Sequence, residues 1–402
     1  MNIAEFLNTN ADKFPRKAAI GFKKRESWKE IHWGDFRRMV FKTANALRKA
    51  GISENDKVAI YSDNSAEWIV FDLAILSLGA VTVPIYSTNN QEQAAYILNE
   101  SECKIILVGN QDQYDASYRI LEESLFLTEI IAAKKLIKLQ KDRSQHYQNF
   151  IKTAAENFDI VAKDDDDLAT IIYTSGTTGV PKGVMLTHGN FHKSVEAHFE
   201  FFKFKNFENE TSLAFLPLTH IFERSWTLLA LHGGAKVYFL ENTKLIANAL
   251  VEVKPTMMCA VPRFYQKIYA VVNEMAQNSA ENKKKIFNWA MKTGNQVADL
   301  RRLDHPIPIS LALKNTMANL LVFNKIKKKT ESGLASAKTN PESIASNIRS
   351  KVDFGERHPY GEVETEATLK NIELKDCIDF YNTYFKPNNA YLVIVGDISV
   401  EE

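Results

Sequence analysis

The residues best suited to chemistry form a loop rich in hydroxyls and glycines. It contains Thr174, Ser175, Gly176, Thr177, Thr178, Gly179 and Lys182. Backbone N–H and side-chain O–H groups in such a turn can converge on one anion, glycine lets the backbone approach closely, and lysine adds positive charge. We therefore expect this loop to bind a polyphosphate. The alternative is a polar turn that only joins two strands.

Apolar runs on both sides of the loop predict the strands that must hold it, at residues 168–173 and 183–187. Elsewhere, strands and helices alternate, which predicts an α/β fold with a largely parallel sheet covered by helices. The predicted strands are 57–62, 81–85, 104–108, 212–215, 235–240 and 256–260. The predicted helices are 33–50, 65–78, 91–100, 190–202, 221–232, 243–253, 263–277, 282–302 and 309–325.

Two histidines after the loop have the spacing of a metal-binding pair on a helix. They are His188 and His192, but no glutamate lies between them, and Asn190 has the side chain of a helix cap. We therefore interpret both histidines as structural, or as loop residues near a nucleotide.

The composition is that of an ordinary globular protein with two or three domains. The 402 residues are 45% hydrophobic and 25% charged, and 50 basic residues balance 49 acidic ones, so nothing favours nucleic acid as a partner. Three scattered cysteines suit neither a disulfide framework nor a zinc site, and the first residues lack the pattern of a signal peptide. These observations predict a cytoplasmic protein.

The loop differs from the Walker pattern because its lysine follows a proline and leads into a strand. It resembles the phosphate loop of the adenylate-forming superfamily. Segments at 56–86, 216–224 and 261–269 resemble the first half of a long-chain fatty acid–CoA ligase. The resemblance covers residues 1–324 and implies an incomplete AMP-binding domain with helix-covered, largely parallel sheets.

This resemblance implies a reaction and roles for particular residues. The loop from Thr174 to Lys182 would hold the phosphates of ATP, and His220 would lie beside the carboxylate of the fatty acid. ATP, Mg²⁺ and CoA would take part, and peripheral contact with the inner face of a membrane is a further expectation. The alternative for His220 is a satisfied histidine at a helix start, and Glu223 with Arg224 suggests a structural ion pair.

The family continues with segments that this sequence lacks. They are an adenine-binding strand, a Tyr-Gly-x-Thr-Glu motif whose glutamate holds Mg²⁺, and a small domain with a catalytic lysine. Without them we expect impaired or absent activity.

A second resemblance begins after residue 340. His358-Pro359-Tyr360-Gly361, residues 384–390 and residues 395–397 are similar to the pitrilysin/insulinase-type zinc peptidases, downstream of their metal site. This sequence does not contain the histidines and glutamate of that metal site, and we interpret His358 as a turn residue. We therefore expect a junction at 325–350 and an α+β peptidase-like fragment at 351–402. An inactive chimeric product, or a non-catalytic peptidase-like module, is the alternative function.

Overall fold

The computed structural model describes residues 1–323, apart from 25–26, 141, 175–180, 204–205, 279 and 303–304. The predicted junction and the predicted peptidase-like fragment lie outside these residues, so the domain boundaries stay predictions. No helix in the described part is long and apolar enough to cross a membrane.

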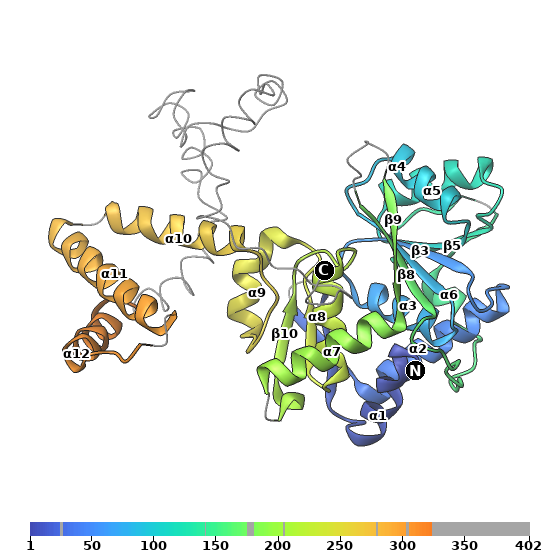
Figure 1. Ribbon diagram of the computed structural model, residues 1–402. Coiled ribbons are helices and arrows are strands. Elements are labelled where there is room, and N and C mark those ends of the chain that lie inside the picture. Colours follow the sequence, from blue (N-terminus) through green and yellow to red (C-terminus); the bar gives the residue numbers. More distant parts are fainter. Residues whose placement is uncertain are drawn as a thin grey trace, which may run out of the picture. The chain divides into compact units, whose positions relative to one another are not determined.

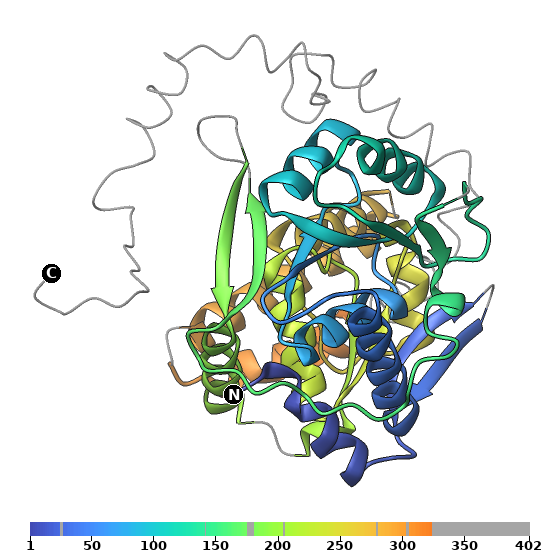
Figure 2. The same cartoon turned by 90° about the vertical axis from the view of Figure 1, so that its right-hand side faces the viewer.

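The larger sheet of the described part has seven strands in the order β7-β6-β5-β3-β4-β8-β9 (Figures 1 and 2). Neighbouring strands are parallel except β8 and β9, which form an antiparallel hairpin. The strands are β3 (Lys57–Tyr61), β4 (Val81–Ile85), β5 (Cys103–Val108), β6 (Glu129–Ala132), β7 (Ser144–His146), β8 (Leu168–Thr174) and β9 (Lys182–Thr187). The predicted parallel sheet is thus confirmed, and so are both strands beside the loop.

Helices cover both faces of this sheet. Val58 and Ile60 of β3 join a core that includes α2 (Trp33–Lys49) and α3 (Ala66–Ser77). Ala59 and Tyr61 point to the other face and join a core that includes α4 (Gln91–Glu100) and α5 (Gln111–Glu123). Because both faces are covered, the central strands β3, β4 and β5 are mostly apolar.

The smaller sheet has the order β10-β11-β1-β2 within the described residues. Its strands are β1 (Ala18–Lys24), β2 (Ser27–His32), β10 (Thr211–Ala214) and β11 (Lys236–Phe239). Strand β1 pairs in parallel with β11 and antiparallel with β2. The N-terminal strands β1 and β2 were not predicted from the sequence.

The remaining helices pack around these sheets or follow them in the chain. They are α1 (Phe6–Lys13), α6 (Tyr147–Phe150), α7 (His188–Phe202), α8 (Ile221–His232), α9 (Ile246–Val253), α10 (Pro262–Gln277), α11 (Glu281–Arg302) and α12 (Ile309–Ala318). Short 3₁₀ turns lie at η1 (Ile3–Glu5), η2 (Phe207–Asn209) and η3 (Thr243–Leu245), and a π-helical turn, η4 (Asn319–Phe323), follows α12. Helices α10–α12 with η4 share a small apolar cluster that contains Phe287 and Val322.

Several predicted elements differ in the structure: α9 begins at Ile246 after a 3₁₀ turn, and α12 ends at Ala318 before a π-helical turn. Residues 256–260 form no strand, and a single bridge joins Met257 to Ser212. The amides of Thr256 and Met257 both donate to Thr211 O, at 2.8 and 3.2 Å, so the regular ladder of a strand cannot continue. Helix α7 begins at His188 instead of Asn190, because Thr187 is its cap and the Asn190 side chain completes a capping box.

Candidate active site

The two ends of the predicted phosphate loop belong to the β8–β9 hairpin (Figure 2). Thr174 ends β8, Lys182 begins β9, and the two residues face each other in the antiparallel register. Both are exposed. Ser175, Gly176, Thr177, Thr178 and Gly179 lie outside the described residues, so their part in binding phosphate stays a prediction.

Aromatic residues support the base of this loop. The ring of Tyr173 lies over Gly183, where an added Cβ would approach the ring to 3.2 Å. Tyr96 of α4 packs edge-on against Tyr173, with ring centroids 6.2 Å apart. The Tyr96 hydroxyl also donates to Pro181 O at 3.3 Å. Helix α4 therefore contacts both ends of the loop, and no pattern in the sequence singled out Tyr96.

The segment that carries His220 runs along the carboxyl ends of β3 and β4. Asn64, just after β3, donates to Leu216 O at 2.7 Å and accepts from Leu218 N at 2.9 Å. The Thr219 hydroxyl donates to Ile85 O at the end of β4, at 3.5 Å. Strand β8 is parallel to β4, so it brings the loop to the same edge of the sheet. In open α/β sheets this edge is where ligands bind.

His220 is the cap of α8, and it is exposed. Its Nδ1 accepts a hydrogen bond from Phe222 N at 3.2 Å. The neutral imidazole must then carry its proton on Nε2, which becomes a donor. His220 thus lies at a helix start, as its alternative interpretation requires, and the same geometry leaves one N–H available for a ligand, so its predicted role beside the fatty-acid carboxylate stays a prediction.

Glu223 lies in the first turn of α8 and is buried, but it does not pair with Arg224 as the sequence suggested. One carboxylate oxygen, Oε2, accepts from Leu216 N at 3.0 Å. The other, Oε1, is buried without a hydrogen-bond partner among the described residues. Burial raises the pKa of Glu223 to about 8. The carboxyl group is therefore mostly protonated at neutral pH.

Arg224 instead forms a fully buried ion pair with Asp72 of α3. Its Nε and one terminal nitrogen bind the carboxylate oxygens at 3.0 and 2.5 Å, and the other terminal nitrogen donates to Thr170 Oγ1 of β8 at 2.7 Å. Thr82 of β4 donates to the same carboxylate at 2.8 Å. This four-residue cluster, which we call the buried network, connects α8 to the strand that carries the loop.

The histidines after the hairpin bind backbone groups. His188 Nδ1 accepts from Ile3 N at 3.1 Å, and burial lowers the pKa of His188 to about 4. His192 Nε2 lies 2.9 Å from Met1 O. These contacts favour the structural interpretation of the pair. Within the described ranges, no group of three or more His, Cys, Asp and Glu side chains could hold a metal ion.

Sequence comparisons identify relatives of the chain. The protein-family model for the AMP-binding enzymes matches residues 7–342. The human long-chain-fatty-acid–CoA ligase ACSBG2 is 29% identical over 390 residues, which cover 92% of this chain and 58% of that protein. The long-chain-fatty-acid–CoA ligase FadD15 of Mycobacterium tuberculosis is 30% identical over 301 residues, which cover 75% of this chain and 50% of that protein. The chain thus spans about half the length of the curated relatives it matches.

Solved structures of CoA ligases share the fold. The long-chain-fatty-acid-CoA ligase FadD1 of Archaeoglobus fulgidus superposes with a TM-score of 0.58 at 22% identity, over 69% of this chain and 54% of that one. The anthranilate CoA ligase AuaEII, in complex with anthranoyl-AMP, superposes with a TM-score of 0.57 at 19% identity, over 64% of this chain and 49% of that one. At these identities, the likeness concerns the arrangement of the helices and sheets.

Proposed function

The chain belongs to the AMP-binding enzyme family, and from this premise we propose that it serves the ATP-dependent activation of a long-chain fatty acid. A carboxylate oxygen attacks the α-phosphorus of ATP, the bond to the bridging oxygen breaks, and pyrophosphate leaves with the electron pair. The sulfur of CoA then attacks the acyl carbonyl and AMP leaves, which yields acyl-CoA. The names of the relatives, which are long-chain-fatty-acid–CoA ligases, support this choice of substrate.

One observation carries the proposal: β8 ends, and its loop begins, at the carboxyl edge of the larger sheet, where the segment with His220 also lies. The phosphates would be held by the loop, that is by Thr174, Ser175, Gly176, Thr177, Thr178, Gly179 and Lys182. The Nε2–H of His220 would donate to an oxygen of the fatty-acid carboxylate. Such donors orient the attacking group and stabilise developing charge.

The proposal includes Mg²⁺ with ATP and CoA. A bound Mg²⁺ would neutralise charge on the phosphates. Since no group of side chains in the described part could hold a metal ion, no described residue is assigned to it.

Binding of ATP to the full 402-residue chain, measured by calorimetry, tests the assignment of the loop. We expect Lys182→Ala to weaken ATP binding about tenfold or more, because a hydrogen bond to a charged group contributes roughly 1.5–3 kcal/mol. Lys193→Ala, at an exposed lysine of α7, is the matched control and should bind ATP normally. Equal affinity in the wild type and Lys182→Ala would show that the lysine does not bind phosphate.

The remaining expectations are also proposals. A cytoplasmic location with peripheral contact to the inner face of a membrane is supported by the scattered cysteines and by a substrate that partitions into lipid. The peptidase-like resemblance of residues 351–402, and with it the chimeric origin, falls outside the described residues. Sequencing the gene through the codons around Lys325 tests that origin.

A further inference from the structure

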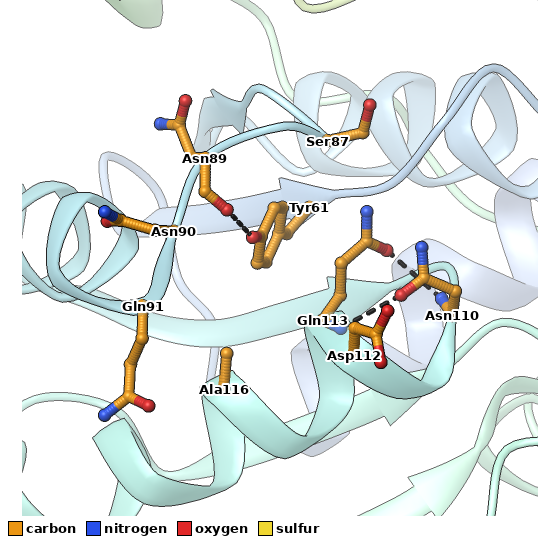
Figure 3. A pocket seen from close by; sticks show the side chains of 9 residues that line it. All are labelled: Tyr61, Ser87, Asn89, Asn90, Gln91, Asn110, Asp112, Gln113 and Ala116. Carbon is orange, nitrogen blue, oxygen red and sulfur yellow. Dashed lines mark hydrogen bonds between the residues drawn. The ribbon is translucent and has the colours of Figure 1, made fainter.

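A hollow lies between the starts of α4 and α5 (Figure 3). Its volume is about 350 Å³. It is bordered by Tyr61 at the end of β3, by Ser87 and Asn89 ahead of α4, and by Asp112 and Gln113 in the first turn of α5. Among the described residues that line it, none is lysine or arginine.

The amide of Gln113 has one orientation only. Its Oε1 accepts hydrogen bonds from Gly109 N and Asn110 N, at 3.0 and 3.1 Å. Because both partners are donors, the oxygen must face them and the NH₂ group must point away from them. Figure 3 shows this nitrogen turned toward the space beside Tyr61 and Ser87.

This NH₂ group is a buried donor that lacks a partner. Gln113 is only 2% exposed, and its Nε2 has no hydrogen-bond partner among the described residues. A buried donor without an acceptor costs free energy, and a ligand oxygen in the hollow would remove that cost.

The backbone around Gln113 is fixed in place. A Cβ added at Gly109 would lie 2.3 Å from Ser62 Oγ and 3.1 Å from Gln113 Oε1. Only glycine therefore lets the end of β5 approach the turn after β3 this closely. These close contacts hold Gly109 against the Ser62 and Gln113 side chains beside the hollow.

The charges in the hollow disfavour an anion. The starts of α4 and α5 would attract one, but the Asn90 and Asn110 side chains already accept from the N–H groups of Gln93 and Gln113 in capping boxes. Asp112 adds a negative charge at the rim. Burial, and secondly the charge of Asp112, raise the pKa of Tyr61, as expected if this carboxylate faces the hollow.

A hydroxyl group suits this set of partners because it both donates and accepts. It can accept from Gln113 Nε2 and donate to the Asp112 carboxylate. The Tyr61 hydroxyl donates to Asn89 O, which fixes its ring as an apolar wall for C–H groups. We propose that the hollow binds a neutral polyhydroxyl molecule, a sugar or polyol.

Saturation-transfer NMR with the full chain tests this proposal, with D-glucose, D-ribose and myo-inositol as probes. We expect Gln113→Glu to weaken binding about tenfold, because it keeps the oxygen that caps α5 and removes the donor. Gln93→Glu is the matched control: Gln93 has the same capping role in α4 and does not line the hollow. It should bind the probe as the wild type does.

Asp112→Asn is a second variant, at an exposed position, and it should also weaken binding of the polyol. If circular dichroism shows that Gln113→Glu is unfolded, the result for Asp112→Asn is the test of the proposal. Inorganic phosphate and CoA are run as comparison ligands. If phosphate or CoA gives a signal that Gln113→Glu weakens, and the polyols give no signal, the proposal of a neutral ligand is wrong. The proposal of this site is wrong if no polyol binds, or if neither variant weakens the binding of a polyol. ATP is absent throughout, so failure here says nothing about the proposed ligase reaction.

Discussion

At the scale of single residues, three polar side chains share one arrangement. In His220, Glu223 and Gln113, one side-chain atom binds a backbone N–H and the other has no partner among the described residues. The backbone bond fixes the direction in which the second atom points. The resemblance to the ligase family singled out His220, but it could not show which nitrogen carries the proton, because that depends on a contact with Phe222.

The buried carboxyl group of Glu223 leads to a prediction about pH. In the folded protein its pKa is about 8, whereas the unfolded chain titrates near the ordinary 4.5. Between these values the folded state holds a proton that the unfolded state has lost, so stability falls as pH rises, by up to about 1.4 kcal/mol per pH unit. Glu223→Gln should remove this contribution.

Urea unfolding of both proteins between pH 5 and pH 8 measures the effect. The free energy of unfolding should fall less steeply with pH in Glu223→Gln than in the wild type. Glu196→Gln, at an exposed glutamate of α7, should keep the wild-type slope. If Glu223→Gln also keeps that slope, the carboxyl group is ionised in the folded protein.

At the scale of elements, the sequence predicted the helix bounds and caps that depend on neighbouring residues in the chain. The helix at 221–232 has the predicted bounds, and Ser65 caps α3 by accepting from Trp68 N. Strands β1 and β2 were missed because β1 pairs with β11, more than 200 residues later, and β2 is largely exposed. Strand preference depends on such partners more than on the residues themselves.

The start of α8 permits a test that separates two roles of His220. Asparagine is a good helix cap but lacks the imidazole, so His220→Asn should keep the helix while it loses the proposed donor to the fatty acid. His220→Ala should lose both, with a cost in stability of roughly 1 kcal/mol. We expect both variants to bind a non-hydrolysable palmitoyl-adenylate analogue more weakly in a calorimetric titration. Wild-type affinity in His220→Asn would mean that the residue is only a cap.

At the scale of the whole described molecule, the buried network joins structures that are distant in the sequence. Asp72 and Arg224 are 152 residues apart, on helices that pack against the larger and the smaller sheet. The only local signs were a charge inside the apolar run of α3 and hydroxyls in two buried strands. Pairing of this kind requires the folded structure, so it could not be predicted from spacing.

Breaking the buried pair should be costly. Asp72→Asn removes the charge opposite Arg224, and we expect it to destabilise the protein by about 3–5 kcal/mol, because an uncompensated guanidinium remains buried. The control is Asp12→Asn, since Asp12 pairs with Arg37 at the surface, where such pairs contribute about 0–1 kcal/mol. Urea unfolding compares the two. A small effect in Asp72→Asn would mean that water reaches the pair.

The buried network also limits how this sequence can evolve. Both members of the pair are completely shielded from solvent, and Thr82 and Thr170 bind them directly. A mutation of either partner alone leaves an unmatched charge, so natural selection should remove it unless the other partner changes as well. In a large set of homologues, positions 72 and 224 should therefore vary together, as an acid with arginine or as two uncharged residues, and should rarely vary separately.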